Sequence, residues 1–375
     1  MTIWRSYGSY HLARVEALGK TFPDAEIICY SHCREDAEYE FFNRQPRNHR
    51  VLVDARSSDL NFIQSFLATL RALLSDKPTL ILTVGYERPE TLASVLYSAF
   101  TKSSVFLMLN NQRADHDRLQ IVESVKRGYL RIFQGFVHAG NTSGEYLLHL
   151  GAEPQKMVGG YNCVDNGMIW DLSERSRRQY PAPFNGRKYF LTVARMIPKK
   201  NYEGIIRAYH TYMQEVASTE TPWLLVIIGD GTERGRIEAM IVDMGLQDSI
   251  LLLGQINEMS KIVYYYTFAS SLVHASHENE QWGLVVNEAM ASGLPVLVSN
   301  QTGCSSDLVE NGVNGFTFDG NSSEGLAKHM LWMHHHKDRL QRMGHHSREI
   351  IKQYSPEVLA QNIHDLVSRT RFDLG

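Results

Sequence analysis

The sequence predicts an α/β protein built from two Rossmann-like, doubly wound domains. Three observations lead to this prediction. Short apolar runs of strand character alternate with helical segments, which is typical of parallel sheets joined by crossover helices. The length of 375 residues suits two domains, and a hydrophobic fraction of 43% is ample for packed cores. The polar stretch 173–186 contains three Arg, two Pro and one Gly, so residues 173–187 are the best candidate linker.

The first half of the chain opens with a strand, a loop and a helix. The loop contains Gly8, which could let a backbone approach a phosphate or an acceptor, or could form a plain turn. The first strand is short for the centre of a parallel sheet, which leaves open whether natural residues precede it. Apolar runs predict strands at 2–4, 26–30, 50–54, 80–84, 105–109 and 136–139, and helical spacing predicts helices at 10–18, 61–74, 91–100, 119–135 and 143–150.

The second half repeats the alternation from Lys188 onward. Gly293 ends one of its helices and is followed by an apolar strand. Apolar runs predict strands at 189–193, 223–228, 250–253, 271–275 and 294–298, and helical spacing predicts helices at 203–216, 234–244, 258–266, 284–291 and 356–369.

Composition excludes several classes of protein. A net charge of −3 and a pI near 6.6 give no overall attraction to nucleic acid or to a membrane surface. No apolar run approaches a membrane span and no signal peptide is visible, so we expect a cytoplasmic protein. Its four scattered cysteines are expected to be idle thiols in a reducing compartment. The histidine runs 334–336 and 345–346 are expected to be solvated faces rather than a metal site.

The stretch 273–298 carries the strongest chemical signal. Glu280 and Glu288 stand eight positions apart, with Gln281-Trp282-Gly283 after the first and a predicted helix around the second. The start of such a helix directs free backbone N–H groups, and the positive end of the helix dipole, at one spot. This spot suits a diphosphate, so the pattern predicts a nucleotide-sugar site.

The string E-Q-W-G-L-V-V-N-E resembles the E-x7-E motif of retaining GT-B glycosyltransferases, especially the family 4 group (glycosyl transferases group 1), and A-M-A-S-G-L-P-V-L resembles its usual continuation. The resemblance is good over about 160–330 and looser before. It implies two Rossmann-like domains facing a cleft: an acceptor-side domain at 1–172, the linker at 173–187, and a nucleotide-sugar-binding domain at 188–346. Helices at 347–375 would cross back to the first domain.

The resemblance also implies the roles of charged residues. A-R-M-I-P-K-K matches the R-x4-K of the family, so Arg195 and Lys200 would neutralise the leaving diphosphate. Helix N–H groups and these cations would replace a divalent metal, so neither metal nor cofactor is expected. The D-H-D at 115–117 has metal-binding spacing but falls in an acceptor-side loop, and we interpret it as acceptor-side or structural.

The remaining site residues follow from the same resemblance. Glu280 would lie near the transferred sugar and Glu288 on the ribose. The loop residues would wrap the donor, with Gly283 leaving room for it and Trp282 either stacking on sugar or filling the loop. The turn with Ile256 would hold the base, and Gly229 would border the diphosphate or form a tight structural turn. The donor-binding prediction thus comprises Glu288, Asn279, Gln281, Trp282, Gly283, Leu284, Ile256 and Gly229.

One departure concerns the acceptor side. Many relatives have a His after the strand at 105–109, where this chain has Asn110 and Asn111. Asn can orient hydroxyls but cannot act as a base, and His116 could substitute for the missing imidazole. Gly8, Asn110, Asn111 and His116 are the predicted acceptor-side residues.

The leading hypothesis is a retaining, metal-independent glycosyltransferase. It would move a sugar from a nucleotide diphosphate sugar to a carbohydrate or lipid-linked acceptor, with surface polysaccharide synthesis as a role. A lipid-linked acceptor would add peripheral contact with the inner membrane face. The alternatives are a catalytically silent GT-B subunit that binds sugar or a partner, and a GT-B nucleotide-sugar epimerase. A sugar phosphorylase would need a pyridoxal-phosphate lysine, which nothing in the sequence marks.

Overall fold

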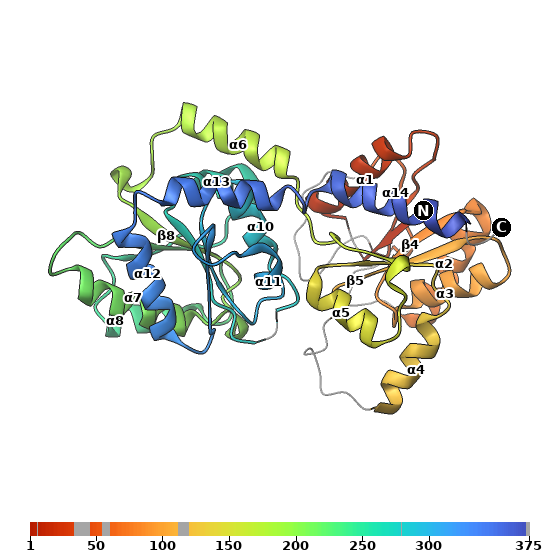
Figure 1. Ribbon diagram of the computed structural model, residues 1–375, viewed down its shortest axis with the longest axis horizontal. Helices are drawn as coiled ribbons and strands as arrows, with labels where there is room; N and C mark the ends of the chain where they lie inside the picture. Colours follow the sequence, from red (N-terminus) through yellow and green to blue (C-terminus); the bar gives the residue numbers. More distant parts are fainter. Residues whose placement is uncertain (6, 34–45, 55–60, 112–119, 279, 373–375) are drawn as a thin grey trace. The chain divides into compact units, whose positions relative to one another are not determined.

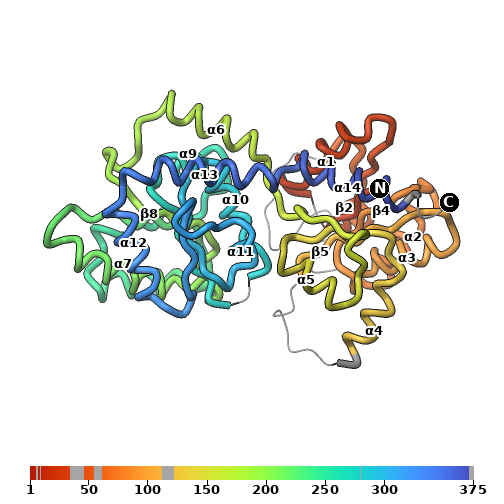
Figure 2. The backbone as a smooth tube through the Cα atoms, viewed as in Figure 1, coloured from red at the N-terminus to blue at the C-terminus, as the bar shows by residue number. Residues whose placement is uncertain are grey.

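The computed structural model describes residues 1–5, 7–33, 46–54, 61–111, 120–278 and 280–372 (Figures 1 and 2). The chain divides into two compact units. Unit 1 comprises Met1–Val164 and Tyr354–Gly375, and unit 2 comprises Asp165–Gln353. The first boundary therefore precedes the predicted limit at 172, and the second follows the predicted limit at 346.

Unit 1 is built on a seven-stranded sheet in the order β3-β2-β1-β4-β5-β6-β7, and every recorded pairing is parallel. Its strands are β1 (Thr2–Trp4), β2 (Cys29–Ser31), β3 (His49–Val51), β4 (Leu80–Val84), β5 (Ser104–Leu109), β6 (Gly135–His138) and β7 (Met157–Val158). Its helices are α1 (Ser9–Thr21), α2 (Phe62–Asp76), α3 (Pro89–Ala99), α4 (Gln120–Leu130), α5 (Asn141–His149), the short η3 (Pro154–Lys156) and α14 (Pro356–Phe372).

Helices cover both faces of this sheet. The C-terminal helix α14 packs beside α1, and its buried residues Leu359, Ile363 and Leu366 recur every three or four positions (Figure 1). The core on the other face combines strand residues with Leu73 of α2 and Tyr146 of α5. A doubly wound domain needs this coverage because both faces of a parallel sheet are apolar.

Unit 2 has a six-stranded parallel sheet in the order β10-β9-β8-β11-β12-β13. Its strands are β8 (Tyr189–Val193), β9 (Leu224–Ile228), β10 (Ile250–Leu252), β11 (Ser271–His274), β12 (Val296–Ser299) and β13 (Gly315–Phe318). Its helices are α6 (Asn166–Gln179), α7 (Tyr202–Val216), α8 (Arg234–Asp243), α9 (Met259–Phe268), α10 (Leu284–Ala291), α11 (Ser305–Leu308), α12 (Ser323–His335) and α13 (Leu340–Ile351), with short η4 (Phe184–Gly186) and η5 (Pro198–Lys200).

Side-chain caps explain where several helices of unit 2 begin. Asp165 accepts a hydrogen bond from the backbone N–H of Met168 at 2.8 Å, Asn201 from Gly204 at 3.0 Å, and Ser322 from Gly325 at 3.0 Å. Helices α7, α8 and α12 pack on the sheet around a large apolar core. Helices α6, α9, α10 and α13 contact one another in a separate group.

The predicted α/β class with two doubly wound, Rossmann-like domains is confirmed, and several local predictions need correction. The predicted linker begins inside α6, which the polar composition of 173–186 concealed. The predicted helix 119–135 was too long, because α4 ends at Leu130 and Gly135 opens β6. A Cβ at Gly135 would lie 2.7 Å from the ring of Phe106, so this position requires glycine for close strand packing.

The histidine runs were only partly solvated. His334 is 1% exposed and its Nδ1 lies 2.8 Å from the hydroxyl of Tyr212, so it belongs to the core of unit 2. The cysteines Cys29, Cys33, Cys163 and Cys304 are all free and buried, as expected. Among the helices of the described residues, none is long and apolar enough to cross a bilayer.

Candidate functional site

The strand order of unit 2 locates a candidate ligand site. Strands β8 and β11 are neighbours in the sheet although three helices and two strands separate them in the sequence, so the winding reverses between them. Ligands of open α/β sheets bind beyond the carboxyl ends of the strands at such a reversal. The loop 194–201, after β8, and the described residues 275–278 and 280–283, after β11, meet there, and a hydrogen bond from His277 N–H to Lys199 O at 3.3 Å joins them.

Lys200 is positioned by a tight turn. It ends η5, donates its backbone N–H to Ile197 O at 3.0 Å, and precedes Asn201, which caps α7. The side chain of Asn201 also donates to Gly320 O at 2.7 Å. This anchoring fixes the point from which the Lys200 ammonium reaches across to the loop after β11.

Glu280 is held by both its backbone and its carboxylate. Its N–H donates to Gln301 O at 3.0 Å, and its carbonyl accepts from Gly303 N–H at 2.7 Å. One carboxylate oxygen accepts a hydrogen bond from Lys200. The other lies 2.8 Å from Nε2 of His274 and accepts a hydrogen bond from the hydroxyl of Ser276.

This surrounding keeps Glu280 ionised. Burial by itself would raise the pKa of its carboxyl group, but His274 and then Lys200 lower the pKa well below its usual range. The side chains of Lys200 and Glu280 are each 14% exposed, so the pair is largely shielded from water. The result is a fixed carboxylate with cationic and hydroxyl neighbours at the edge of the sheet.

The turn after Glu280 leads into α10. Gly283 has φ of +98°, and a Cβ there would lie 3.0 Å from Thr302 and 3.2 Å from the ring of His274. Glycine is therefore required by the loop itself, which is a different reason from the predicted collision with a donor. Among the described residues, the backbone N–H groups of Leu284 and Val285 have no hydrogen-bond acceptor, so the first turn of α10 retains free donors.

Two of the predicted site residues in this segment, Trp282 and Glu288, are buried. Trp282 is 4% exposed and its indole N–H donates to Asn287 at 2.8 Å, which favours the loop-filling interpretation of this residue. Glu288 is 4% exposed, and its carboxylate accepts a hydrogen bond from the hydroxyl of Tyr266 at 2.9 Å. Its position in the second turn of α10 agrees with the expected helix.

The other predicted site residues lie in the loops after β8, β9, β10 and β11. Arg195 directly follows Ala194 at the end of β8 and is exposed, Ile256 is half-buried after β10, and Gln281 is exposed. Gly229 has φ of +146°, and a Cβ there would lie 1.9 Å from the carbonyl oxygen of Ala194. The Gly229 turn is thus a close backbone contact that shapes the loop carrying Arg195 and Lys200.

The predicted acceptor-side residues belong to unit 1. Gly8 precedes α1, and Asn110 and Asn111 follow β5. Within the described part of the chain, the buried Oδ1 of Asn110 has no hydrogen-bond partner. Asn279, His116 and the D-H-D sequence lie outside the described residues. Among those described, no three His, Cys, Asp or Glu side chains are grouped to hold a metal ion.

His11 makes unit 1 sensitive to acid. Its Nδ1 accepts a hydrogen bond from the Gly8 N–H at 3.1 Å, and burial, followed by the charge of Arg14, lowers its pKa to about 3. Below pH 6.5 the unfolded chain takes up a proton that the folded one does not, so stability falls as pH decreases. We expect the wild-type protein to lose about 2 kcal/mol more unfolding free energy than His11→Gln between pH 7 and pH 5.

Denaturant unfolding at pH 7, 6 and 5 measures this difference. His149→Gln changes an exposed histidine of α5 in the same unit and should retain the wild-type slope. Parallel slopes for wild type and His11→Gln would contradict the assignment.

Sequence reasoning missed the residues that hold Glu280. His274 and Ser276 come from the end of β11, and residues 301–303 approach from the loop after β12. The only signal in the sequence was that His274 and Ser276 interrupt an apolar strand end six and four residues before the glutamate.

Comparisons with known proteins agree with this geometry. Residues 173–350 match the family described as glycosyl transferases group 1. An uncharacterized glycosyltransferase of Haemophilus influenzae is 26% identical over 46% of this chain and 47% of its own length. The first curated relatives are all matched over less than half of their own length.

Solved structures match over nearly the whole chain. Sucrose-phosphate synthase from Thermosynechococcus elongatus has a TM-score of 0.74 at 17% identity, covering 100% of this chain and 99% of its own. The Anabaena protein HepE in complex with UDP has a TM-score of 0.73 at 16% identity, with 98% of both chains covered. The chain therefore has the GT-B fold, and its residues 173–350 are similar to the glycosyl transferases group 1 family.

Proposed function

We propose that the protein is a glycosyltransferase that takes a sugar from a nucleotide diphosphate donor bound at the carboxyl edge of the unit 2 sheet. One observation carries the proposal: Lys200, His274 and Ser276 converge on the Glu280 carboxylate beside the free N–H groups of α10. This combination offers positive groups to a diphosphate and a fixed acid to a sugar.

The leaving diphosphate gains negative charge as the glycosidic bond breaks. Lys200 and the first-turn N–H groups of α10 would stabilise that charge, and Arg195 on the same loop as Lys200 adds a second cation. Phosphate oxygens would then share Lys200 with Glu280. These protein groups can neutralise the diphosphate themselves, so we infer that transfer needs no divalent metal.

Glu280 would act at the sugar. Its ionised carboxylate can accept hydrogen bonds from sugar hydroxyls and stabilise positive charge at the anomeric carbon. We assign the ribose of the donor to Glu288 and Gln281–Leu284 to its surroundings, and the acceptor to unit 1, with Gly8, Asn110 and Asn111 among its contacts. The unpartnered Oδ1 of Asn110 supports that last assignment because it can accept a hydrogen bond from an acceptor hydroxyl.

Relatives support this class of reaction. The Anabaena protein HepE was solved with UDP, and the Haemophilus relative is named a glycosyltransferase. On that basis, and from the E-x7-E motif, we infer retention of the anomeric configuration and a carbohydrate or lipid-linked acceptor. Surface polysaccharide synthesis at the cytoplasmic face of a membrane is the corresponding role.

Donor screening tests the proposal. A sugar nucleotide that binds the folded state should raise the melting temperature. At a concentration of 100 times its dissociation constant, it should add about 2.7 kcal/mol to the free energy of unfolding. We expect this response from one of the UDP-, GDP- or ADP-hexoses, with slow donor hydrolysis that Glu280→Gln removes. Binding without hydrolysis or transfer would instead identify a silent GT-B subunit, and conversion of the nucleotide sugar to its epimer would identify an epimerase.

Two further experiments test the retaining mechanism and the independence of a divalent metal. We expect the product to have the anomeric configuration of the donor by proton NMR, and the rate to change less than twofold in excess EDTA, because the neutralising groups belong to the protein. An inverted product would overturn the retaining mechanism. A rate lost in EDTA and restored by Mg²⁺ or Mn²⁺ would overturn metal independence.

A further inference from the structure

Unit 2 has a pocket at the edge of its sheet opposite to Glu280. It has a volume of about 570 Å³, which suits a small organic molecule. Lys188, Ser270 and Pro295, which line it, directly precede β8, β11 and β12. The pocket therefore opens at the amino ends of these strands, whereas Glu280 lies beyond their carboxyl ends.

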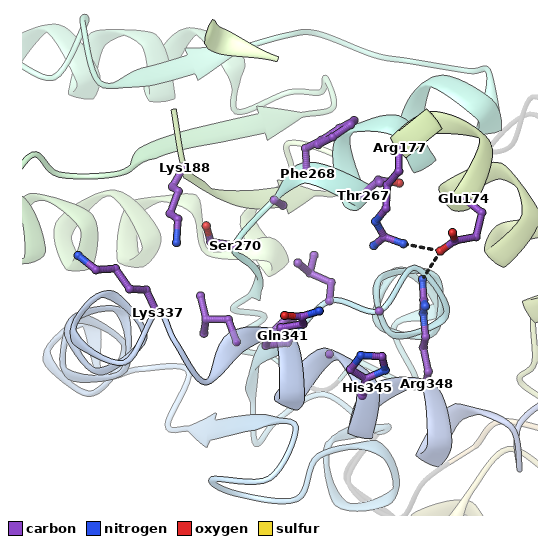
Figure 3. Close-up of a pocket in the computed structure, with 16 residues that line it drawn as sticks. Glu174, Arg177, Lys188, Thr267, Phe268, Ser270, Lys337, Gln341, His345 and Arg348 are labelled. Atoms are coloured by element: carbon purple, nitrogen blue, oxygen red, sulfur yellow. Dashed lines mark hydrogen bonds and ion pairs between the residues drawn. The ribbon is translucent and has the colours of Figure 1, made fainter. Parts of the chain in front are cut away.

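Positive charge dominates the pocket walls. Figure 3 shows Lys188 and Lys337 on one side and Arg177 and Arg348 on the other, with His345 on the same helix as Arg348. Among the described residues that line the pocket, the one acidic side chain is Glu174. The described part of the cavity wall thus carries four cationic side chains and a single carboxylate.

The available acidic groups leave these cations incompletely balanced. Glu174 lies 2.7 Å from Nη1 of Arg177 and 3.6 Å from Nη2 of Arg348, so one carboxylate serves two guanidinium groups. Lys337 pairs at 2.8 Å with Glu220, which does not line the pocket. Lys188 lies over the ring of Trp223 at 5.4 Å and has no acidic partner among the described residues.

The pKa values of Lys188 and Arg348 agree with this excess of positive charge. Desolvation, followed by the charge of Lys337, lowers the pKa of Lys188. Desolvation, followed by the charge of Arg177, lowers the pKa of Arg348 against the opposing effect of Glu174. In both cases a neighbouring cation adds to the lowering of the pKa, and an anion bound in the pocket would offset that contribution.

The shape of the pocket limits the kind of anion. Cations on two facing walls require several negative oxygens spread along one ligand, which clustered phosphate groups provide. Leu294 and Leu340 also line the pocket and contribute apolar surface, which suits an organic portion of a ligand. We propose that this pocket binds a phosphorylated small molecule through Lys188, Lys337 and Arg177. The proposal is independent of whether the chain transfers a sugar.

Hydrogen exchange with tripolyphosphate as the probe tests this site locally. The donor site also attracts phosphates, so a local readout is needed. We expect tripolyphosphate to slow exchange in peptides covering 266–270 and 337–348, with a weaker effect of inorganic phosphate. The double variant Lys188→Gln/Lys337→Gln should weaken the apparent affinity for these peptides at least about tenfold, because each lost contact involves a charged group.

Two controls separate this site from general charge effects and from the donor site. Lys261→Gln/Lys328→Gln removes the same charge from exposed positions of α9 and α12 and should change the affinity less than twofold. Lys200→Gln should leave protection at 337–348 intact. Gln341→Glu adds a carboxylate to the pocket wall without removing a cation and should also weaken binding.

Three results would overturn the proposal. The first is the absence of protection at 266–270 and 337–348 in wild type at millimolar tripolyphosphate. The second is protection there that Lys188→Gln/Lys337→Gln and Gln341→Glu leave unchanged. The third is loss of that protection on Lys200→Gln, which would assign the effect to the carboxyl edge of the sheet.

Discussion

Glu280→Gln is expected to slow glycosyl transfer about a thousandfold while changing donor affinity less than tenfold. The amide keeps the shape of the side chain. Its single oxygen can still accept a hydrogen bond from Lys200, and its NH2 group can donate one to the hydroxyl oxygen of Ser276. It loses the negative charge that His274 and Lys200 maintain by lowering the carboxyl pKa. Positive charge develops at the sugar only in the transition state, so the rate should fall far more than binding.

Steady-state kinetics with the donor identified by screening measure this effect. His274→Gln should lower the turnover number less, about tenfold to a hundredfold, because His274 is buried and would act through its contact with the Glu280 carboxylate. Glu258→Gln, an exposed acid of the same unit that pairs with Lys261, should be neutral. A Glu280→Gln variant that retains more than a tenth of the wild-type turnover would remove Glu280 from the mechanism.

Gly229→Ala is expected to destabilise unit 2 by about 4 kcal/mol, which corresponds to roughly a 10 °C lower melting temperature for a unit of this size. The backbone at Gly229 has φ of +146°, a region that residues with a Cβ rarely adopt. The added Cβ would also meet the carbonyl oxygen of Ala194 at 1.9 Å. That carbonyl accepts the hydroxyl of Tyr202 at 2.7 Å, so displacing it disturbs the start of α7 as well.

Gly235→Ala is the matched control. Gly235 lies in α8 of the same unit, and a Cβ there would meet nothing within 4 Å. This change should be neutral or stabilise the protein by up to about 1 kcal/mol, because alanine favours a helix over glycine. Thermal unfolding measures the melting temperatures of wild type and both variants. Equal melting temperatures for the two variants would disprove the steric argument at Gly229.

Most helices and strands of the fold could be predicted because their signals are local. The apolar strand 189–193 and the helices at 203–216 and 284–291 coincide closely with β8, α7 and α10. Predictions were weaker where local composition was misleading. The polar stretch 173–186 contains the second half of α6, and the apolar pattern of 119–135 did not reveal the break before Gly135.

The site was predictable only in part. The sequence identified Glu280 and Lys200 through their motifs, and these residues form a direct ion pair. It could not identify His274 and Ser276 as partners of Glu280, because a histidine at a strand end has many environments. It also could not show that Thr302 and His274 exclude a side chain at Gly283, because these neighbours come from other parts of the fold.

The sequence alone determined the fold class, most of the strands and helices and the positions of the charged motifs, because periodicity and glycine placement are properties of neighbouring residues. Only the tertiary structure decided which loops meet at the strand reversal, which groups surround the Glu280 carboxylate, and that four cations converge at the opposite edge of the sheet. These features depend on strand order, which places β8 beside β11 and so brings Lys200 to Glu280, eighty residues further along the chain. Local patterns do not encode such contacts.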